Sequence, residues 1–334
     1  MSNDPNFTTA AGPATEELIV DATEAQRRRK PSRIVRVGDH LKREWQLYLM
    51  LIPTIVWLLV FLYKPMYGLQ IAFKDYSIFR GIADSPWIGL EHFQTLFNND
   101  QFLRALRNTV IISFYGLIFG FPMPIILALM FNEILRQTFK KTAQTIVYLP
   151  HFISSVIIAG IVITAFSPSA GIVNTMLGWF GIEPIYFLTK PEWFRPIFVG
   201  TGIWQEAGFQ SIVYLAAIAG VSPTLYESAV VDGASRWQMM WKITIPSIMP
   251  TIIIMLIIRI GNMLEVSFEM IILLYQPATY ETADVVNTFI YRQGIQGGQY
   301  DLAAAAGLFN AVVAFVLVMT ANTISKRYSR TSLW

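Results

Sequence analysis

Residues 226–250 read YESAVVDGASRWQMMWKITIPSIMP, the longest polar run in the C-terminal half of a strongly apolar chain. Long apolar segments flank this run on both sides, which places it at a membrane surface. Ser222 and Pro223, just before it, form a helix start signal: a capping hydroxyl, then a proline at a position where the amide has no helical partner. Gly233 is expected to end that helix after Asp232, because glycine adopts positive φ without a steric penalty.

A second short helix is expected directly after this glycine. Ser235 can cap its first turn. Four residues would then share one face at three- and four-residue spacing: Trp237, Met240, Trp241 and Thr244. Pro246 should break this helix before the next apolar run. The stretch therefore predicts a helix–glycine–helix knuckle at the membrane surface, a shape suited to fitting into a groove on a partner.

The composition of the whole chain describes an integral membrane protein. Of its 334 residues, 54% are hydrophobic and only 14% are charged, and the mean hydropathy is +0.47. The net charge of +3 is too small to favour nucleic acid as a partner. The absence of cysteine excludes disulfides, thiolate catalysis and Cys-based zinc sites. We therefore expect an all-α protein whose helices cross a bilayer.

Six segments are long and apolar enough to cross about 30 Å of hydrocarbon, which takes roughly 20 helical residues. They are residues 46–63, 105–131, 143–166, 195–219, 247–270 and 302–325. Pro122 and Pro124 predict a kink in the second span. Gly116 and Gly120 in the same span have the GxxxG spacing that can mark close helix packing, although such pairs are common in membrane helices.

The N-terminal residues indicate how the chain is oriented in the membrane. Residues 1–31 are polar and predict a disordered cytoplasmic tail, and residues 32–45 predict a basic interfacial helix. Six spans place both termini on one side, and 16 of the 25 Lys and Arg fall on that side against 8 on the other. Both termini and the loop 221–246 are therefore expected in the cytoplasm. Residues 46–334 would form one six-span domain with long extracytoplasmic loops.

The knuckle resembles the EAA loop of the permeases of ATP-binding-cassette (ABC) importers. Eight residues match that pattern: Glu227, Ala229, Asp232, Gly233, Ala234, Trp237, Ile243 and Pro246. The chain departs from it at Ser228, where the family usually has alanine, a change between two small residues. In that family the loop docks into a groove on a separate cytoplasmic ATPase. The alternative interpretation is an amphipathic surface loop without a partner.

Further stretches between residues 45 and 334 resemble the LplB-like branch of the carbohydrate-importer permeases. They are FKDY at 73–76, YLPHFISS at 148–155, FEMIILLY at 268–275, DVVNTFIYRQG at 284–294 and the final SLW. The resemblance implies a type I importer-like fold in a bacterial inner membrane. It also implies a heterodimer with a second homologous permease, two copies of an ABC ATPase and an extracytoplasmic solute-binding protein. That branch is associated with complex oligosaccharides, so acidic oligosaccharides derived from alginate or pectin are the leading candidate substrates, with neutral oligosaccharides as the alternative.

The chain shows no motif for chemistry of its own. It lacks the GxxxxGK phosphate-binding loop, so ATP and Mg²⁺ are expected at the partner ATPase and no cofactor on this chain. His40, His92 and His151 are far apart and show no metal-ligand spacing, and no catalytic residue emerges. A helix-packing hydrogen bond is the favoured role of His151.

Two other classes of protein stay open. An ion-gradient-driven secondary transporter would want ionisable residues in matching broken helices of two repeats, and no internal repeat is visible. A membrane scaffold or receptor without transport is the other alternative. In a secondary transporter the EAA-like loop would be unexplained.

Six polar residues in the fourth and fifth spans are candidates for the substrate pathway: Gln205, Glu206, Gln210, Arg259, Asn262 and Glu265. Charge at bilayer depth is costly and usually faces a bundle interior or a wet cavity. Arg259, near the centre of the fifth predicted span, could bind sugar hydroxyls or a uronate carboxylate, since a guanidinium suits bidentate carboxylate contacts. It could instead pair with Glu206 or Glu265 and hold two helices in register, and this structural role is favoured.

Overall fold

The computed structural model describes residues 43–329, and this part of the chain is helical almost throughout. The described residues divide into two compact units, one up to Gly68 and the other from Leu69 on. The described helices of the first unit are α3 (Trp45–Trp57), η1 (Leu58–Tyr63) and α4 (Lys64–Met66). They form most of a candidate membrane span, Trp45–Phe73, and no residue of α3 is buried. The predicted tail 1–31 and nearly all of the predicted interfacial helix 32–45 lie outside the described residues.

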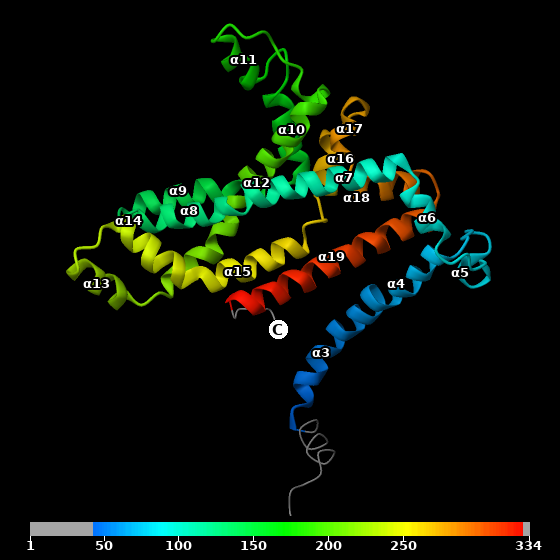
Figure 1. Cartoon of the computed structure of the whole chain (residues 1–334), viewed down its shortest axis with the longest axis horizontal. Helices are drawn as coiled ribbons and strands as arrows, with labels where there is room; N and C mark the ends of the chain where they lie inside the picture. The colour runs from blue at the N-terminus through cyan, green and yellow to red at the C-terminus, as the bar shows by residue number, and fades with distance from the viewer. Residues whose placement is uncertain (1–42, 330–334) are drawn as a thin grey trace, which may run out of the picture. The chain divides into compact units, whose positions relative to one another are not determined.

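Three long continuous helices dominate the second unit and run in similar directions in Figure 1. The first joins α7 (Asp100–Tyr115), η3 (Gly116–Gly120) and α8 (Pro122–Glu133). The second joins α14 (Arg236–Met239), η6 (Met240–Thr244) and α15 (Ile245–Gly261). The third is α19 (Tyr300–Ser329), which packs along α15.

Two further spans are bent. The helix formed by α9 (Gln137–Tyr148) and η4 (Leu149–Phe152) meets α10 (Ser155–Ala165) at 103°, and α12 (Pro191–Ala219) meets α13 (Pro223–Val231) at 70°. With each bent pair taken as one span, the described residues contain six candidate membrane spans, and otherwise four. The predicted all-α fold is confirmed.

Short helices connect the spans. They are α5 (Gly81–Asp84), α6 (Glu91–Phe97), α11 (Ile172–Gly178), η5 (Phe187–Thr189), α16 (Phe268–Leu274), η7 (Pro277–Thr279), α17 (Tyr280–Ala283), α18 (Val286–Ile290) and η8 (Tyr291–Gln296), with η2 (Tyr67–Phe73) at the end of the first span. An isolated antiparallel bridge between Lys74 and Trp87 closes the loop that carries α5. The buried ammonium of Lys74 donates to the carbonyl of Ile82 at 2.6 Å, so this loop is held from inside.

The prolines of the second and fifth spans each follow a π-helical turn. The kink of the second span stays a prediction: one helix runs over Asp100–Glu133, and η3 ends two residues before Pro122. The prediction that Pro246 breaks its helix is wrong, since η6 precedes α15 in the same way and one helix runs over Arg236–Gly261. A π turn inserts an extra residue into the hydrogen-bond ladder, so the ring and the missing amide of proline are accommodated without ending the helix.

The prediction of a fifth span over 247–270 is wrong at both ends, because the helix begins at Arg236 and ends at Gly261. Gly261 approaches α19 so closely that an added Cβ would lie 2.7 Å from Cγ2 of Val318. The hydroxyl of Ser113 on α7 donates a hydrogen bond to the carbonyl of Met263, just beyond the helix end. Residues 262–267 therefore form a non-helical break before α16.

Three clusters of buried apolar side chains hold the second unit together. One joins α10, α12 and α16 around Phe194. Another joins α7, α18 and α19 around Phe102 and Phe289, whose ring centroids are 5.4 Å apart. The third joins α8, α12 and α15 around Tyr214 and Ile248. Between membrane spans such side chains gain close van der Waals packing rather than removal from water, and this packing fixes the spans against one another.

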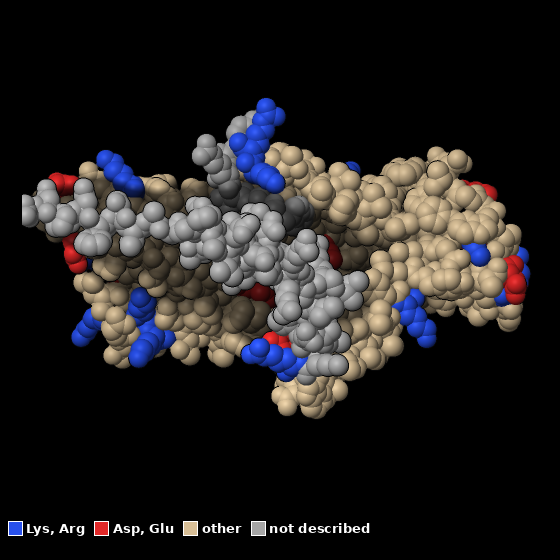
Figure 2. Space-filling view, turned by 90° about the horizontal axis from the view of Figure 1, so that it is seen from below, with Lys and Arg blue, Asp and Glu red and all other residues tan. Residues whose placement is uncertain are grey.

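Charge is sparse on one face of the described residues. Apart from the grey atoms, most of the face in Figure 2 is tan, the colour of residues other than Lys, Arg, Asp and Glu. Many large hydrophobic side chains along the spans are exposed, as expected for helices that face lipid or another subunit.

Candidate functional site

The predicted knuckle is present and consists of α13, the turn 232–235 and α14. Gly233 has φ +76°, and two backbone hydrogen bonds close the end of α13. The amide of Gly233 donates to the carbonyl of Val230 at 3.0 Å, and the amide of Ala234 donates to that of Ala229 at 2.9 Å. This pair is the Schellman motif, which requires positive φ at the position of the glycine. Backbone geometry therefore demands Gly233.

The second helix of the knuckle is capped as predicted. The Ser235 amide donates to Oε1 of Gln238 at 2.8 Å, and the Gln238 amide donates to Oγ of Ser235 at 3.3 Å, which is a capping box. The prediction that the Ser222 hydroxyl caps α13 is wrong, because it lies 2.8 Å from Oγ1 of Thr224 instead. The helix still begins at Pro223, whose fixed φ suits a first turn.

Two side-chain contacts connect the knuckle to membrane helices. The Tyr226 hydroxyl lies 3.0 Å from Oγ1 of Thr244, a buried residue on η6. Nη1 of Arg236 lies 3.8 Å from Oε2 of Glu133, the last residue of α8. A displacement of the knuckle would therefore act directly on the long helix that contains α15 and on α8.

The outer surface of the knuckle is free for a partner. No residue of α13 is buried, and Val230 and Val231 are 61% and 87% exposed. Within the described residues, the carboxylates of Glu227 and Asp232 form no ion pair and no side-chain hydrogen bond. Exposed valines beside unpaired carboxylates are typical of an interaction surface.

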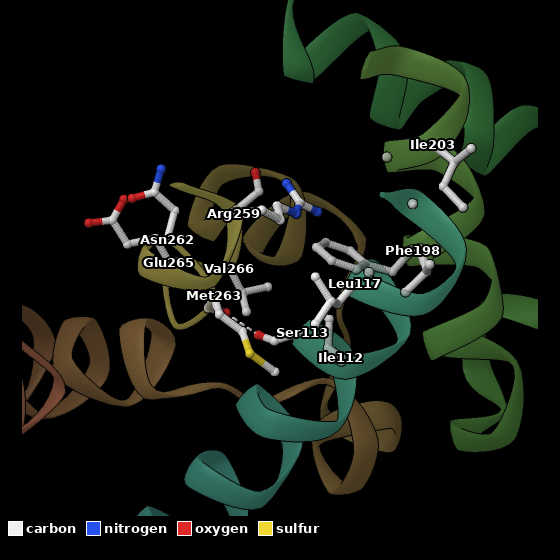
Figure 3. Close-up of a pocket in the computed structure, with 15 residues that line it drawn as sticks. Ile112, Ser113, Leu117, Phe198, Ile203, Arg259, Asn262, Met263, Glu265 and Val266 are labelled. Carbon is white, nitrogen blue, oxygen red and sulfur yellow. Dashed lines mark hydrogen bonds between the residues drawn. The ribbon is translucent and has the colours of Figure 1, made fainter. Parts of the chain in front are cut away.

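A cavity of about 200 Å³ lies between η3, α12 and the break that follows α15 (Figure 3). Arg259, in the last turn of α15, directs its guanidinium towards η3. A Cβ added to Gly116 would lie 3.3 Å from Nη2 of Arg259, and one added to Gly120 would lie 3.9 Å from the same atom. The glycine pair, noted for its GxxxG spacing, thus leaves room for an arginine side chain.

The cavity separates the six pathway candidates into two groups. Arg259, Asn262 and Glu265 line it, whereas Gln205, Glu206 and Gln210 do not. Asn262 and Glu265 point to the opposite side from the guanidinium in Figure 3. Glu265 lies in the break and not on the helix α15 that carries Arg259.

The predicted pairing of Arg259 with Glu206 or Glu265 is wrong. Oε2 of Glu206 lies 3.1 Å from Nδ1 of His151, whose ring stacks on Phe209 with centroids 3.9 Å apart. This contact has the helix-packing character expected of His151. Within residues 43–329, Arg259 forms no ion pair and no side-chain hydrogen bond. The early end of α15 explains this, because it turns Glu265 away from the helix face that carries Arg259.

Residues 120–331 match the family described as binding-protein-dependent transport system inner membrane component. The chain belongs to this family. It is a permease component of a binding-protein-dependent ABC sugar importer, with the type I importer fold. The predicted LplB-like resemblance and the inner-membrane family are confirmed.

Curated relatives and solved structures cover nearly the whole permease. The polygalacturonan/rhamnogalacturonan transport system permease protein YteP of Bacillus subtilis (strain 168) is 42% identical over 288 residues, or 86% of this chain and 90% of the relative. Protein LplB of the same organism is 42% identical over 294 residues, or 88% and 92%.

Two solved structures are more similar still in sequence. A chain of a bacterial ABC transporter involved in the import of the acidic polysaccharide alginate is 60% identical, with a TM-score of 0.82 over 88% of this permease and 99% of that chain. A chain of a bacterial alginate ABC transporter in complex with an alginate pentasaccharide-bound periplasmic protein is 59% identical, with a TM-score of 0.83 over 89% and 100%.

The permease also contains a buried polar cluster that sequence reasoning missed. The Asp284 side chain is fully buried, and Arg292 donates to its two oxygens at 2.8 and 2.7 Å. The hydrogen bonds to Asp284 raise the pKa of Arg292, while burial acts in the opposite direction. No helical spacing signals this pair, because Asp284 precedes α18 and residues eight apart on a helix lie about 12 Å apart along its axis.

The cluster continues across two other spans. Nδ2 of Asn108 on α7 donates to the carbonyl of Asp284 at 2.9 Å. Nη2 of Arg195 on α12 donates to Oδ1 of Asn108 at 2.8 Å. We call Asp284, Arg292, Asn108 and Arg195 the polar clasp. It joins α7, α12 and the segment α17–η8, and no sequence pattern brings Arg195 and Asn108 together because they lie on separate spans.

Proposed function

We propose that this permease carries acidic oligosaccharides, with alginate- or pectin-derived fragments as the leading candidates, across the bacterial inner membrane by alternating access. It would act with a second homologous permease, two copies of a cytoplasmic ABC ATPase and an extracytoplasmic solute-binding protein. The substrate class is supported by the 60% identity to a chain of an alginate importer and the 42% identity to a polygalacturonan/rhamnogalacturonan permease.

The geometry of the knuckle supports the proposal that transport is coupled to ATP hydrolysis. Its turn is held by the Schellman motif at Gly233 and the capping box at Ser235, so it can transmit force as a rigid body. The excess of Lys and Arg on its side of the spans supports a cytoplasmic location for the knuckle and both termini. ATP and Mg²⁺ would bind at the partner ATPase, where hydrolysis takes place.

In the proposed transport cycle, these contacts transmit the motion. A loaded binding protein docks on the extracytoplasmic loops, and ATP closes the ATPase dimer. The groove that holds residues 227–233 then moves, and the long helix Arg236–Gly261 moves with it through the contact of Tyr226 with Thr244. The outward-open state is favoured only when ATP and the binding protein are both engaged, which makes the cycle a coupling of two binding free energies.

Within this proposal, the pathway passes the cavity lined by Arg259, Asn262 and Glu265. Gln205, Glu206 and Gln210 lie on α12 away from it, and Glu206 holds α12 against η4 through His151. These three candidates are therefore assigned to helix packing or to a more distant part of the path.

The substrate class is tested by ATP hydrolysis of the complex that co-purifies with the permease, reconstituted in lipid discs. Uronate and neutral oligosaccharides are supplied side by side on the solute-binding protein. We expect stimulation by uronates. Stimulation by neutral oligosaccharides alone would overturn the substrate class, and the absence of a co-purifying ATPase would overturn ATP coupling.

Replacing Gly233 by Val tests the knuckle itself. We expect the variant to reach the membrane but to lose stimulation of ATP hydrolysis by the loaded binding protein, because a β-branched residue at φ +76° distorts the turn. The control is Gly220→Ala, at the start of the same loop, where φ is −81° and an added Cβ meets only an ordinary contact of 3.4 Å. Normal stimulation of the Gly233→Val complex would refute the lever role.

A further inference from the structure

We propose that the cavity beside η3 is a subsite for the carboxylate of a uronate sugar, and that Arg259 is its specificity-determining residue. The inference rests on the proposed import of acidic oligosaccharides and deepens it by naming the group recognised and the residues that recognise it. Four features of the cavity support it: the helix break, the wall of glycines, the unpaired guanidinium and an aromatic platform.

The helix break lies at the depth of the middle of a membrane span. Met263 is bonded to Ser113, and Arg259 lies against Gly116, which is near the midpoint of the 34-residue helix Asp100–Glu133. Non-helical backbone at membrane depth is tolerated where it is buried in protein or lines a water-filled cavity. Residues 262, 263 and 265–267 of the break all line this cavity.

Three glycines form the opposite wall. Gly116 and Gly120 face Arg259, and a Cβ on Gly202 of α12 would meet no atom within 4 Å. Each glycine costs a helix about 1 kcal/mol relative to alanine. At these glycines the loss of helix stability coincides with open space around the guanidinium of Arg259. The volume of about 200 Å³ is several times the roughly 30 Å³ that one water molecule occupies in the liquid.

The ionisable residues of the cavity indicate which kind of ligand it would bind. Arg259 and Glu265 are the only ionisable residues among the described residues that line it. The guanidinium has no protein partner there and is exposed to the cavity, whereas Glu265 points away from it. An unpaired arginine at this depth matches a planar anion, and its forked donors fit a carboxylate with two parallel hydrogen bonds.

An aromatic ring completes a sugar-sized site. Phe198 of α12 lines the cavity and is labelled close to Leu117 in Figure 3. It stacks on the buried Phe194, with centroids 5.9 Å apart and an angle of 14° between the rings, so its orientation is fixed. A flat apolar ring beside a carboxylate-binding cation suits a uronate, which combines an apolar C–H face with a negative group.

The test is equilibrium binding of a labelled uronate oligosaccharide, and of its carboxyl-reduced neutral form, to the full transporter complex in lipid discs without the binding protein. We expect the wild type to bind the uronate form more tightly. Arg259→Gln should weaken uronate binding by about tenfold to a hundredfold, the size of a charge-assisted hydrogen-bonded pair, and change binding of the neutral form less than about twofold. Arg136→Gln, an exposed arginine before α9, is the matched control.

Two glycine variants separate charge from volume. Gly116→Ala places a methyl group 3.3 Å from Nη2 of Arg259, so part of the preference for the uronate form should be lost. Gly202→Ala adds the same methyl group where no atom lies within 4 Å, so the preference should persist.

The outcomes distinguish this subsite from the proposed function. If uronates stimulate the wild-type ATPase but Arg259→Gln keeps the full preference, the subsite is refuted and the importer stands. If Arg259→Gln lowers the amount of co-purifying second permease, the guanidinium pairs with that subunit and the subsite is refuted as well. If binding follows the anionic-lipid content of the discs rather than the sugar's carboxylates, the site holds a lipid phosphate, which also overturns the proposal.

Discussion

Arg292 in the polar clasp and Arg259 in the cavity are two arginines with opposite surroundings. Arg292 is 19% exposed and binds both oxygens of a fully buried Asp284. Arg259 is exposed to a cavity and has no side-chain partner among the described residues. A buried cation is retained only with its counter-charge in place. The clasp is therefore structural, whereas the cavity has a cation available for a ligand.

The glycines of α12 also differ from one another, in how closely they are packed. A Cβ on Gly208 would lie 2.1 Å from the carbonyl oxygen of Val147, so α9 and α12 touch backbone to backbone at this point. Glycines at 200 and 202, two turns earlier on the same helix, meet no atom within 4 Å. Near its middle, α12 thus changes from bordering open space at Gly200 and Gly202 to close backbone packing at Gly208. The difference shows which glycines serve packing and which leave room for something else.

Removing the clasp carboxylate should have the largest effect on stability. We expect Asp284→Asn to lower the free energy of unfolding by about 3–5 kcal/mol, because Arg292 then remains largely buried without a counter-charge. The measurement is thermal unfolding of the purified complex. Asp75→Asn is the control, since the exposed pair of Asp75 with Arg80 at 3.1 Å should be worth at most about 1 kcal/mol. Equal losses of stability in Asp284→Asn and Asp75→Asn would show that the buried polar clasp contributes no more than the exposed ion pair.

Adding a methyl group where the backbone of α12 contacts α9 should have the second-largest effect on stability. Gly208→Ala should lower the free energy of unfolding by about 1–3 kcal/mol, because α9 must move to admit a methyl group. On the same helix, Gly200→Ala should be neutral or stabilising by up to about 1 kcal/mol, since it fills no occupied space and favours helix. The two melting temperatures, measured side by side, decide this prediction. A loss of stability in both variants would contradict the open space found around Gly200.

Neutralising Arg259 should have the smallest effect on stability. We expect Arg259→Gln to change the free energy of unfolding by about 0.5 kcal/mol or less, as for substitutions that remove no described contact. The comparison with Arg292→Gln, which removes two charge-assisted hydrogen bonds from the buried Asp284, is made by thermal unfolding under the same conditions. If Arg259→Gln and Arg292→Gln lower the free energy of unfolding equally, Arg259 has a structural role like that of Arg292.

Local sequence signals accounted for the fold class and for the knuckle. Apolar segments of about 20 residues predicted the spans, because a lipid-facing helix must be apolar along its whole length. Gly233 and Ser235 predicted the turn, since a Schellman motif and a capping box are made from residues close in sequence. Their hydrogen bonds join residues at most five positions apart.

Tertiary structure decided where the fifth span ends and what its arginine touches. The close approach of Gly261 to α19 and the bond of Ser113 to Met263 end the helix, and both join residues far apart in sequence. Hydropathy alone continued the span to residue 270, because the apolar residues of the break and of α16 keep the average high across the polar Asn262, Glu265 and Ser267. The separation of Arg259 from Glu206 and the joining of Arg195 to Asn108 likewise depend on how spans pack. Spacing along one chain indicates which residues share a helix face, but only packing between helices brings distant faces together.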